Sequence, residues 1–397
     1  MENRTGLFTN TIIRFGVAIS VSEIEAGIQT ATGAPINSIW IPLILGHIIG
    51  GLLLFAVGLI GARLRVNAME SIKSTFGNLG SKFFALLNVL QLIAWVAVLN
   101  AQGTLALLGL NLPISFPIIS FILAGLVAIW VFIGLQRSSK VTSVIMIALT
   151  ILLILLTVKL FGISAYPSAA IKNTTSLSFW NIFEISIAMP ISWLPVISDY
   201  TKDVEKPVKA AALSAAAYTI ASLWMYFIGV EVVSVGTTSI SHAILLSSLG
   251  IQGVLILVLS TVTTNFLATN SAGESAKAIF NRLDPKITGV VVSILSAIIA
   301  ISGIMNHYIN FLYLISSVFG PMAAVLLVSF YIGGEENEAR DWYWNIFAWL
   351  VGFIVYQVTV NLDSIFLGPS LLAIIASGAL AYIWILVKRY NLRLKSS

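Results

Sequence analysis

Two carboxylates stand in the first long apolar segment of this sequence. The stretch RFGVAISVSEIEAGIQT, residues 14 to 30, contains Glu23 and Glu25. A charge at the centre of a bilayer costs roughly 3 kcal/mol, so such residues are retained mainly for a function. A carboxylate can accept hydrogen bonds from the exocyclic amine and a protonated ring nitrogen of an aminopyrimidine, whereas it repels a substrate carboxylate. We therefore expect at least one of the two to bind substrate or carry a proton. The alternative is that it pairs with an internal cation, and Arg14 lies in the same segment.

A second group of polar side chains follows in LLNVLQLIAWVAVLNAQG. Asn88, Gln91 and Trp95 are spaced by three and four residues, which places them on one helical face. An aromatic plane flanked by amides can stack a flat heterocycle and hydrogen-bond its edge. The alternative is that Trp95 packs and the amides join neighbouring helices, as they do in many membrane bundles.

A hydroxyl cluster, STVTTNFLATNS, begins at Ser260, and Ser260, Thr263 and Thr264 share one face of a helix. Hydroxyl oxygens together with carbonyls freed by an unwound helix suit a hard cation such as Na⁺. The alternative is that each hydroxyl bonds the carbonyl one turn earlier in its own helix.

The elements that must position these residues are membrane helices. Of the 397 residues, 58% are hydrophobic and 9% are charged, and the mean hydropathy is +0.99. Apolar runs long enough to cross a bilayer recur throughout, which indicates an all-α polytopic membrane protein. We expect the whole chain to be mature protein, because no segment resembles a cleavable signal. Cysteine is absent, which excludes disulfides and thiolate chemistry.

Twelve transmembrane helices are predicted, with boundaries uncertain by a few residues. Their ranges are 12–31, 38–61, 83–109, 114–134, 141–162, 179–198, 210–234, 253–274, 287–303, 308–331, 342–360 and 367–388.

The charge distribution predicts the orientation. With both termini in the cytoplasm, only Lys159 and Lys172 of the 21 Lys and Arg residues lie outside, as the positive-inside rule requires. The net charge of +5 is then explained by Lys and Arg residues on the cytoplasmic side of the membrane, and a nucleic-acid partner is not expected. We predict a multi-pass protein of the cytoplasmic membrane.

The first and sixth spans carry polar or helix-breaking residues. The sixth reads FWNIFEISIAMPISWLPVISDYT, with Glu184, Pro190 and Pro195, and two prolines should break or bend it. Spans one and six are five apart, as in transporters built from two inverted five-helix repeats. Glu184 is equally consistent with a functional or a structural role, and Asp199 with a gate ion pair or a solvated helix end. The predicted units are the first repeat, 1–162, the second repeat, 163–331, and two further helices, 332–397.

Two connecting segments are predicted to contain short helices, of which the first, 62–82, is weakly amphipathic. Residues 62–82 and 235–252 could each form a short helix that acts as a connector or a lid, and connectors are favoured. The three histidines are too far apart for a metal site, and His47 is expected to be structural. No nucleophile lies near a plausible base, so an enzyme is not expected.

Six motifs together resemble the nucleobase:cation symporter-1 family, nearest its hydroxymethylpyrimidine transporter branch. They are SVSEIEAG, AMESIKSTFG, LNVLQLIAW, SWLPVISDYTKD, TVTTNF and HYINFLYLISSVFGPM. The resemblance implies a leucine-transporter-type fold of two inverted five-helix repeats plus two C-terminal helices. It also implies alternating access coupled to Na⁺ or H⁺.

The resemblance also assigns residues. Trp95 matches a substrate-stacking tryptophan, and Ser260, Thr263 and Thr264 match a sodium site completed by main-chain carbonyls near Ser20 and Glu23. The family's second aromatic falls near Met189 and Pro190, with Trp193 one turn later, and its substrate asparagine falls at Thr269 beside Asn270.

We predict a secondary active transporter, and not an enzyme, that imports hydroxymethylpyrimidine or a related aminopyrimidine as a monomer in the lipid bilayer. The coupling ion is Na⁺ or H⁺, and no other cofactor is expected. The alternatives are an amino-acid or polyamine transporter of the same fold, or a non-concentrative channel or sensor. The predicted substrate residues are Glu23, Glu25, Gln91, Trp95, Met189, Trp193, Thr269 and Asn270.

Overall fold

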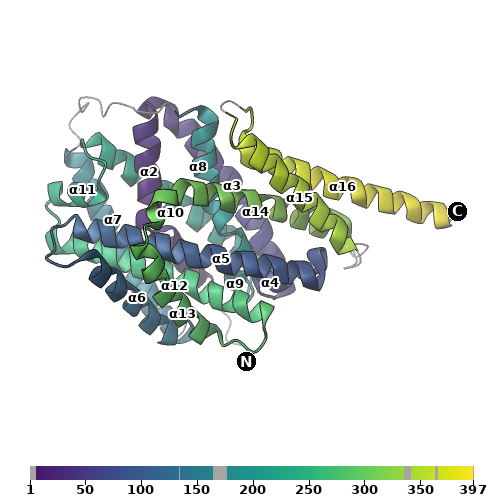
Figure 1. The fold of residues 1–397 in the computed structure, drawn as a ribbon, viewed down its shortest axis with the longest axis horizontal. Helices are drawn as coiled ribbons and strands as arrows, with labels where there is room; N and C mark the ends of the chain where they lie inside the picture. Colours follow the sequence, from purple (N-terminus) through teal and green to yellow (C-terminus); the bar gives the residue numbers. More distant parts are fainter. Residues whose placement is uncertain (1–5, 134, 164–176, 335–340, 363–364, 397) are drawn as a thin grey trace.

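The computed structural model describes residues 6–133, 135–163, 177–334, 341–362 and 365–396, and all the regular elements in these ranges are helices (Figure 1). The predicted all-α class is therefore confirmed. Of the described helices, nine are long and apolar enough to cross a membrane, and one bent pair counts as a tenth. Two shorter or less apolar helices, Pro285–Ile301 and Trp342–Thr359, match the remaining two predicted spans. Arg4, Lys172 and Arg340 lie outside the described residues.

The elements in chain order are α1 (Leu7–Ala18), α2 (Val21–Gly33), α3 (Ile36–Leu64), α4 (Ala68–Ser71), α5 (Lys73–Leu108), α6 (Phe116–Ile133), α7 (Leu135–Ile163), α8 (Phe179–Ser192), η1 (Leu194–Val196), α9 (Ile197–Thr201), α10 (Pro207–Ser234), α11 (Ile240–Leu246), α12 (Gly250–Ile279), α13 (Pro285–Ile301), η2 (Ile304–His307), α14 (Tyr308–Val328), η3 (Ser329–Gly333), α15 (Trp342–Thr359) and α16 (Gly368–Ser396).

The first predicted span is two helices with a break between them. The axes of α1 and α2 differ by 47°, and Ser20 at the break is extended, with φ −138° and ψ 152°. Its hydroxyl caps α2 by accepting a hydrogen bond from the Glu23 amide at 3.3 Å. The carbonyl of Ile19 stands at the break and is free to accept hydrogen bonds from another helix.

The sixth predicted span is also divided, as its prolines predict. α8 ends at Ser192, a short 3₁₀ turn η1 follows, and α9 begins at Ile197. Pro195 lies in η1, where its missing amide donor costs nothing. Pro190 lies inside α8, so the break comes three residues after it.

The broken helices pack closely against their neighbours. A Cβ added at Gly27 of α2 would lie 2.4 Å from the Tyr226 carbonyl oxygen of α10, and one at Gly229 of α10 would lie 2.2 Å from the Ile24 carbonyl oxygen. Only glycine permits this approach of two helix backbones. The crossing holds α2 and α10 in one position along their axes.

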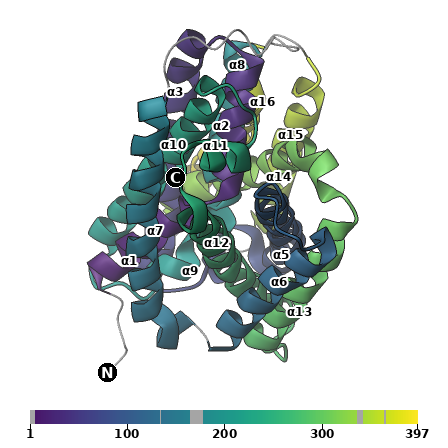
Figure 2. The same cartoon turned by 90° about the vertical axis from the view of Figure 1, so that its left-hand side faces the viewer.

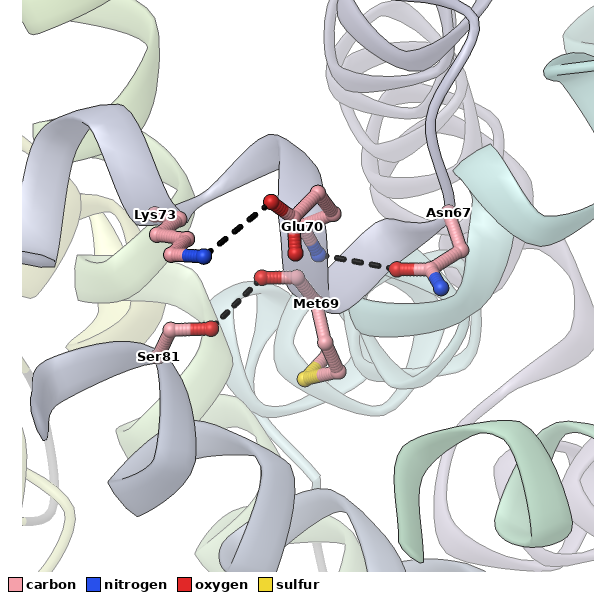
Figure 3. A network of polar contacts seen from close by, with 5 residues as sticks. All are labelled: Asn67, Met69, Glu70, Lys73 and Ser81. Carbon is pink, nitrogen blue, oxygen red and sulfur yellow. Dashed lines mark hydrogen bonds and ion pairs between the residues drawn. The ribbon is translucent and has the colours of Figure 1, made fainter. Parts of the chain in front are cut away.

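The two predicted connecting segments contain short helices. Residues 62–82 include α4, where Asn67 Oδ1 accepts from the Glu70 amide at 2.8 Å (Figure 3). Lys73 pairs with Glu70 at 3.3 Å, and Ser81 Oγ donates to the Met69 carbonyl at 2.6 Å, which fastens α4 to α5. The second connector contains α11.

The last two helices lie side by side and extend away from the others (Figures 1 and 2). Glu184 of α8 joins them to the body. Its carboxylate accepts from Tyr356 Oη of α15 at 2.8 Å, and from the amide and hydroxyl of Ser370 of α16 at 3.0 and 2.5 Å. These bonds support the structural interpretation of Glu184.

Candidate substrate and ion site

Glu23 is buried just beyond the break between α1 and α2, with 3% of its surface exposed. Its Oε1 accepts from Tyr218 Oη at 3.0 Å and its Oε2 accepts from Ser222 Oγ at 2.7 Å, both from α10. All these partners are neutral. The interpretation of Glu23 as the partner of an internal cation is therefore wrong for this structure, because the ion pairs formed by described residues join Lys73 to Glu70 and Lys388 to Asp341.

Ser222 extends this contact to a third helix. Its Oγ lies 2.7 Å from His47 Nε2 of α3, and His47 Nδ1 lies 2.7 Å from Ser186 Oγ of α8. The ring of Tyr226 contacts His47 edge-on, with centroids 4.8 Å apart. His47 is fully buried. It is therefore a bonded histidine, as expected, and it connects α3, α8 and α10 directly behind Glu23.

Glu25 occupies a different environment. It is partly buried, and its nearest hydrogen-bonding neighbour is Gln29, one turn later in α2. Side chains at positions i and i+2 of a regular helix point about 200° away from each other. The helix α2 is regular across both glutamates. Glu23 therefore faces α10, and Glu25 does not.

Gln91 and Trp95 lie on the face of α5 that approaches the broken helices. Gln91 Nε2 donates to Asn88 Oδ1 at 2.8 Å and to the Ser192 carbonyl at 3.2 Å, at the end of α8. The buried Gln91 Oε1 and Trp95 Nε1 have no partner in the described structure. Buried polar atoms are nearly always hydrogen-bonded, so this free acceptor and free donor suit a ligand. The Trp95 ring is flanked by two rings of α14, that of Phe311 edge-on at 5.4 Å and that of Tyr308 at 6.3 Å between centroids.

The other predicted substrate residues are less free. The guanidinium of Arg14 lies over the Trp193 ring, 5.6 Å from its centroid, so one face of that ring is already covered. Thr269 is fully buried and its hydroxyl donates to the Asn265 carbonyl of its own helix. Met189 is buried at 1% exposure, and Asn270 is only partly buried.

The predicted sodium residues separate into two kinds. Ser260 Oγ and Thr264 Oγ1 donate to the Ile19 carbonyl at 3.0 and 3.3 Å. Thr263 Oγ1 instead donates to the Leu259 carbonyl at 2.6 Å, within its own helix. Two hydroxyls and a carbonyl at a helix break are oxygen ligands of the type that coordinate Na⁺ in such folds. The other two residues named for the sodium site use their side chains elsewhere. The Ser20 hydroxyl caps α2, and the Glu23 carboxylate bonds to α10.

Sequence reasoning missed the partners of Glu23. Tyr218 and Ser222 are four residues apart and share one face of α10. This spacing was a detectable signal, but nothing in the sequence links it to a glutamate 195 residues earlier.

The comparisons with known proteins identify the family and the fold of this chain. The family of permeases for cytosine/purines, uracil, thiamine and allantoin matches residues 2–345. The chain belongs to this permease family. No curated protein sequence matches the chain.

Solved structures show the same fold as this permease. One is Mhp1, a nucleobase-cation-symport-1 transporter in a closed conformation with bromovinylhydantoin bound, with 20% identity, a TM-score of 0.72, and coverage of 96% of this chain and 93% of Mhp1. A Na⁺-coupled sialic acid symporter has 14% identity, a TM-score of 0.70 and coverage of 97% and 91%. MhsT in complex with L-phenylalanine has 15% identity, a TM-score of 0.63 and coverage of 96% and 98%.

The permease therefore has the predicted leucine-transporter-type fold and is a secondary active transporter of the nucleobase-cation symporter family, not an enzyme.

Proposed function

We propose that this permease imports an aminopyrimidine, with hydroxymethylpyrimidine the leading candidate, by alternating access coupled to Na⁺. The observation that carries the proposal is Glu23, a buried carboxylate beside a helix break whose two protein partners are both neutral hydroxyls. A carboxylate has about four lone-pair sites, so two acceptor sites remain for the amine and a protonated ring nitrogen of a pyrimidine.

Two atoms of α5 complete a recognition surface for a flat heterocycle. The Trp95 indole offers a plane and an unpaired N–H, and Gln91 offers an unpaired amide oxygen. Aromatic planes bind nucleobases by stacking, which contributes about 1–3 kcal/mol per base. The bromovinylhydantoin held by Mhp1 is also a heterocycle, although the low identity limits that likeness to the fold.

The coupling ion in this proposal is Na⁺, bound by the Ile19 carbonyl with Ser260 and Thr264. These oxygens join α12 to the break between α1 and α2. An ion there would bind best when α12 lies against the break between α1 and α2. Na⁺ occupancy would then be coupled to the position of α2, which carries Glu23. We also propose that the protein is a monomer in the cytoplasmic membrane, with its two repeats in 1–162 and 163–331 and both termini inside.

The test is binding of hydroxymethylpyrimidine, cytosine and thiamine to the purified permease, in Na⁺ and in K⁺. Wild type is compared with Glu23→Gln and with Glu25→Gln as the matched control. We expect Na⁺-enhanced pyrimidine binding that weakens at least about tenfold in Glu23→Gln, since a charge-assisted bond contributes on the order of 1.4 kcal/mol or more. Glu25→Gln should change it little.

Three outcomes would contradict the proposal. Equal loss in both variants would remove the special role of Glu23. Binding of arginine or spermidine, but of no pyrimidine, would favour an amino-acid or polyamine transporter. Pyrimidine binding without Na⁺ dependence, but with proton uptake, would replace Na⁺ by H⁺ as the coupling ion.

A further inference from the structure

Arg14 is a buried cation without a hydrogen-bond partner in the described structure. It lies on α1 with 0% exposure, and its Nε, Nη1 and Nη2 atoms are all enclosed and unpaired. A guanidinium has five N–H donors and stays charged in proteins. Because a buried charge is costly unless it is paired, these donors require a partner that this arrangement of helices does not supply.

Two aromatic rings hold the guanidinium in its place. Arg14 Cζ lies 4.8 Å from the Tyr200 ring centroid and 5.6 Å from that of Trp193. Cation–π contacts stabilise the charge but leave the N–H groups free. The Tyr200 hydroxyl donates to the Leu267 carbonyl at 2.8 Å. The position of Arg14 is therefore fixed while its donors remain available.

Asp199 has the complementary free acceptor. It precedes Tyr200 in α9, its Oδ1 accepts from the Ala68 amide at 2.9 Å, and its Oδ2 is buried without a partner. Its charge acts on Arg14, although the two are too far apart to form an ion pair in this state. An unpaired buried cation and an unpaired buried carboxylate oxygen thus lie on facing elements.

Among the described residues, no other group near Asp199 forms an ion pair with it. Lys202 is partly exposed and forms no ion pair within the described residues, and Glu274 has the same charge as Asp199. Ser271 is a hydrogen-bonding neighbour of Asp199 and also lies 3.1 Å from Tyr200 Oη, but its hydroxyl is neutral and supplies no countercharge. Arg14 is the buried cation that fits.

Arg14 and Asp199 each lie on one half of a span that is divided by a break. α1 ends at Ala18, where the chain bends by 47°, and α9 follows the turn η1 after α8. The helices α1 and α9 lie in the same part of the molecule (Figure 2), and Arg14 of α1 contacts the Tyr200 ring of α9. Because each half-helix is joined to its other half by a break, rotation of α1 relative to α2, or of α9 relative to α8, is the motion that would bring Arg14 to Asp199.

We infer that Arg14 and Asp199 form an ion pair in another state of the transport cycle and so join α1 to α9. In that state the pair closes the path between the two half-helices. In the state described here, the rings of Tyr200 and Trp193 hold the released guanidinium. A contact made in one of two states shifts their populations. The inference depends on alternating access but not on the identity of the substrate.

The absence of cysteine in this chain permits a direct test. Arg14→Cys/Asp199→Cys is treated with a short bis-methanethiosulfonate in membranes, in Na⁺ and in K⁺. The matched control is Arg14→Cys/Lys202→Cys, because Lys202 is also in the α9 region but is partly exposed. We expect more cross-linking than in the control, with a yield that differs at least about threefold between the two salts as the populations shift.

Two outcomes would overturn the inference: a yield no greater than the control in both salts, or a high yield that is equal in both. This readout needs no substrate, so its failure is distinct from failure of the pyrimidine proposal.

A charge exchange gives a second, functional test. We expect Na⁺-driven uptake to fall at least about tenfold in Arg14→Asp and in Asp199→Arg. Uptake should recover to within about threefold of wild type in the variant with both changes. A double variant that folds but transports no better than the poorer single variant would contradict the pair. Folding of each variant is checked by size-exclusion chromatography. If a single variant does not fold, the readout is whether the double variant yields folded protein.

Discussion

Ser222 is the residue on which the bonding around Glu23 depends, since it contacts both Glu23 Oε2 and His47 Nε2 at 2.7 Å. Removing the Ser222 hydroxyl takes a hydrogen-bond partner from each of two buried atoms, Glu23 Oε2 and His47 Nε2. Among the described residues, the Tyr218 hydroxyl forms a hydrogen bond only with Glu23 Oε1. The two side chains lie one turn apart on α10, so they can be compared in the same surroundings.

We expect Ser222→Ala to lower the free energy of unfolding by about 1–3 kcal/mol, because an unsatisfied buried donor or acceptor costs that much. Tyr218→Phe should lower the free energy of unfolding by less, because the contact between Ser222 and His47 remains. Thermal unfolding of both variants in the same detergent would measure the difference. Equal losses would show that the link from Ser222 to His47 contributes nothing to stability.

The two kinds of hydroxyl in α12 give another prediction. Thr264 reaches the Ile19 carbonyl, whereas Thr263 bonds within its own helix. We expect Thr264→Val to raise the Na⁺ concentration for half-maximal uptake by about tenfold, which corresponds to the loss of one ligand oxygen, or about 1.4 kcal/mol. Thr263→Val, the matched control, should raise it less. Equal shifts would mean that Thr263 turns to the ion, as the family resemblance implies.

At the scale of elements, the sequence marked both divided spans as irregular, the first by its polar residues and the sixth by two prolines expected to break or bend it. Both are local properties, since polar residues and missing amide donors act on their own helix. The partners of Glu23 and the surroundings of Arg14 were not predictable. They arise where α2 and α1 meet α10 and α9, nearly 200 residues later, and no periodicity within one helix reports such a contact. The placement of Trp193 against Arg14 was missed for the same reason.

The crossing of α2 and α10 is the element contact that positions Glu23. A Cβ on Gly229 would also come within 2.8 Å of Gly27 Cα, and these neighbours are backbone atoms that cannot turn aside. We expect Gly229→Ala to separate the helices, lower the unfolding free energy by about 1–3 kcal/mol and weaken substrate binding. Gly125→Ala on α6 is the matched control, because nothing lies within 4 Å of its added Cβ. Unfolding temperatures and binding would be measured together, and an unchanged Gly229→Ala protein would refute the close packing.

At the scale of the whole molecule, the last two helices contact the body partly through one carboxylate. Glu184 lies on α8, the half of the broken helix opposite α9, and its bonds go to α15 and α16. In the alternating access proposed above, α9 would move beyond the η1 turn while α8 stays attached to α15 and α16. Under that proposal, the last two helices belong to the framework against which the half-helices would move.

Removing that carboxylate should release the last two helices without disturbing the Glu23 site. In Glu184→Ala the partners Tyr356 Oη and the amide of Ser370 lose their acceptor, and we expect a loss of about 3 kcal/mol in unfolding free energy. Hydrogen exchange should quicken in α15 and α16 and stay unchanged in α2 and α10. Asn361→Ala, at the exposed end of α15, serves as the control and should leave exchange unaltered. Faster exchange across all helices, or none in α15 and α16, would show that Glu184 does not fasten these two helices to the framework.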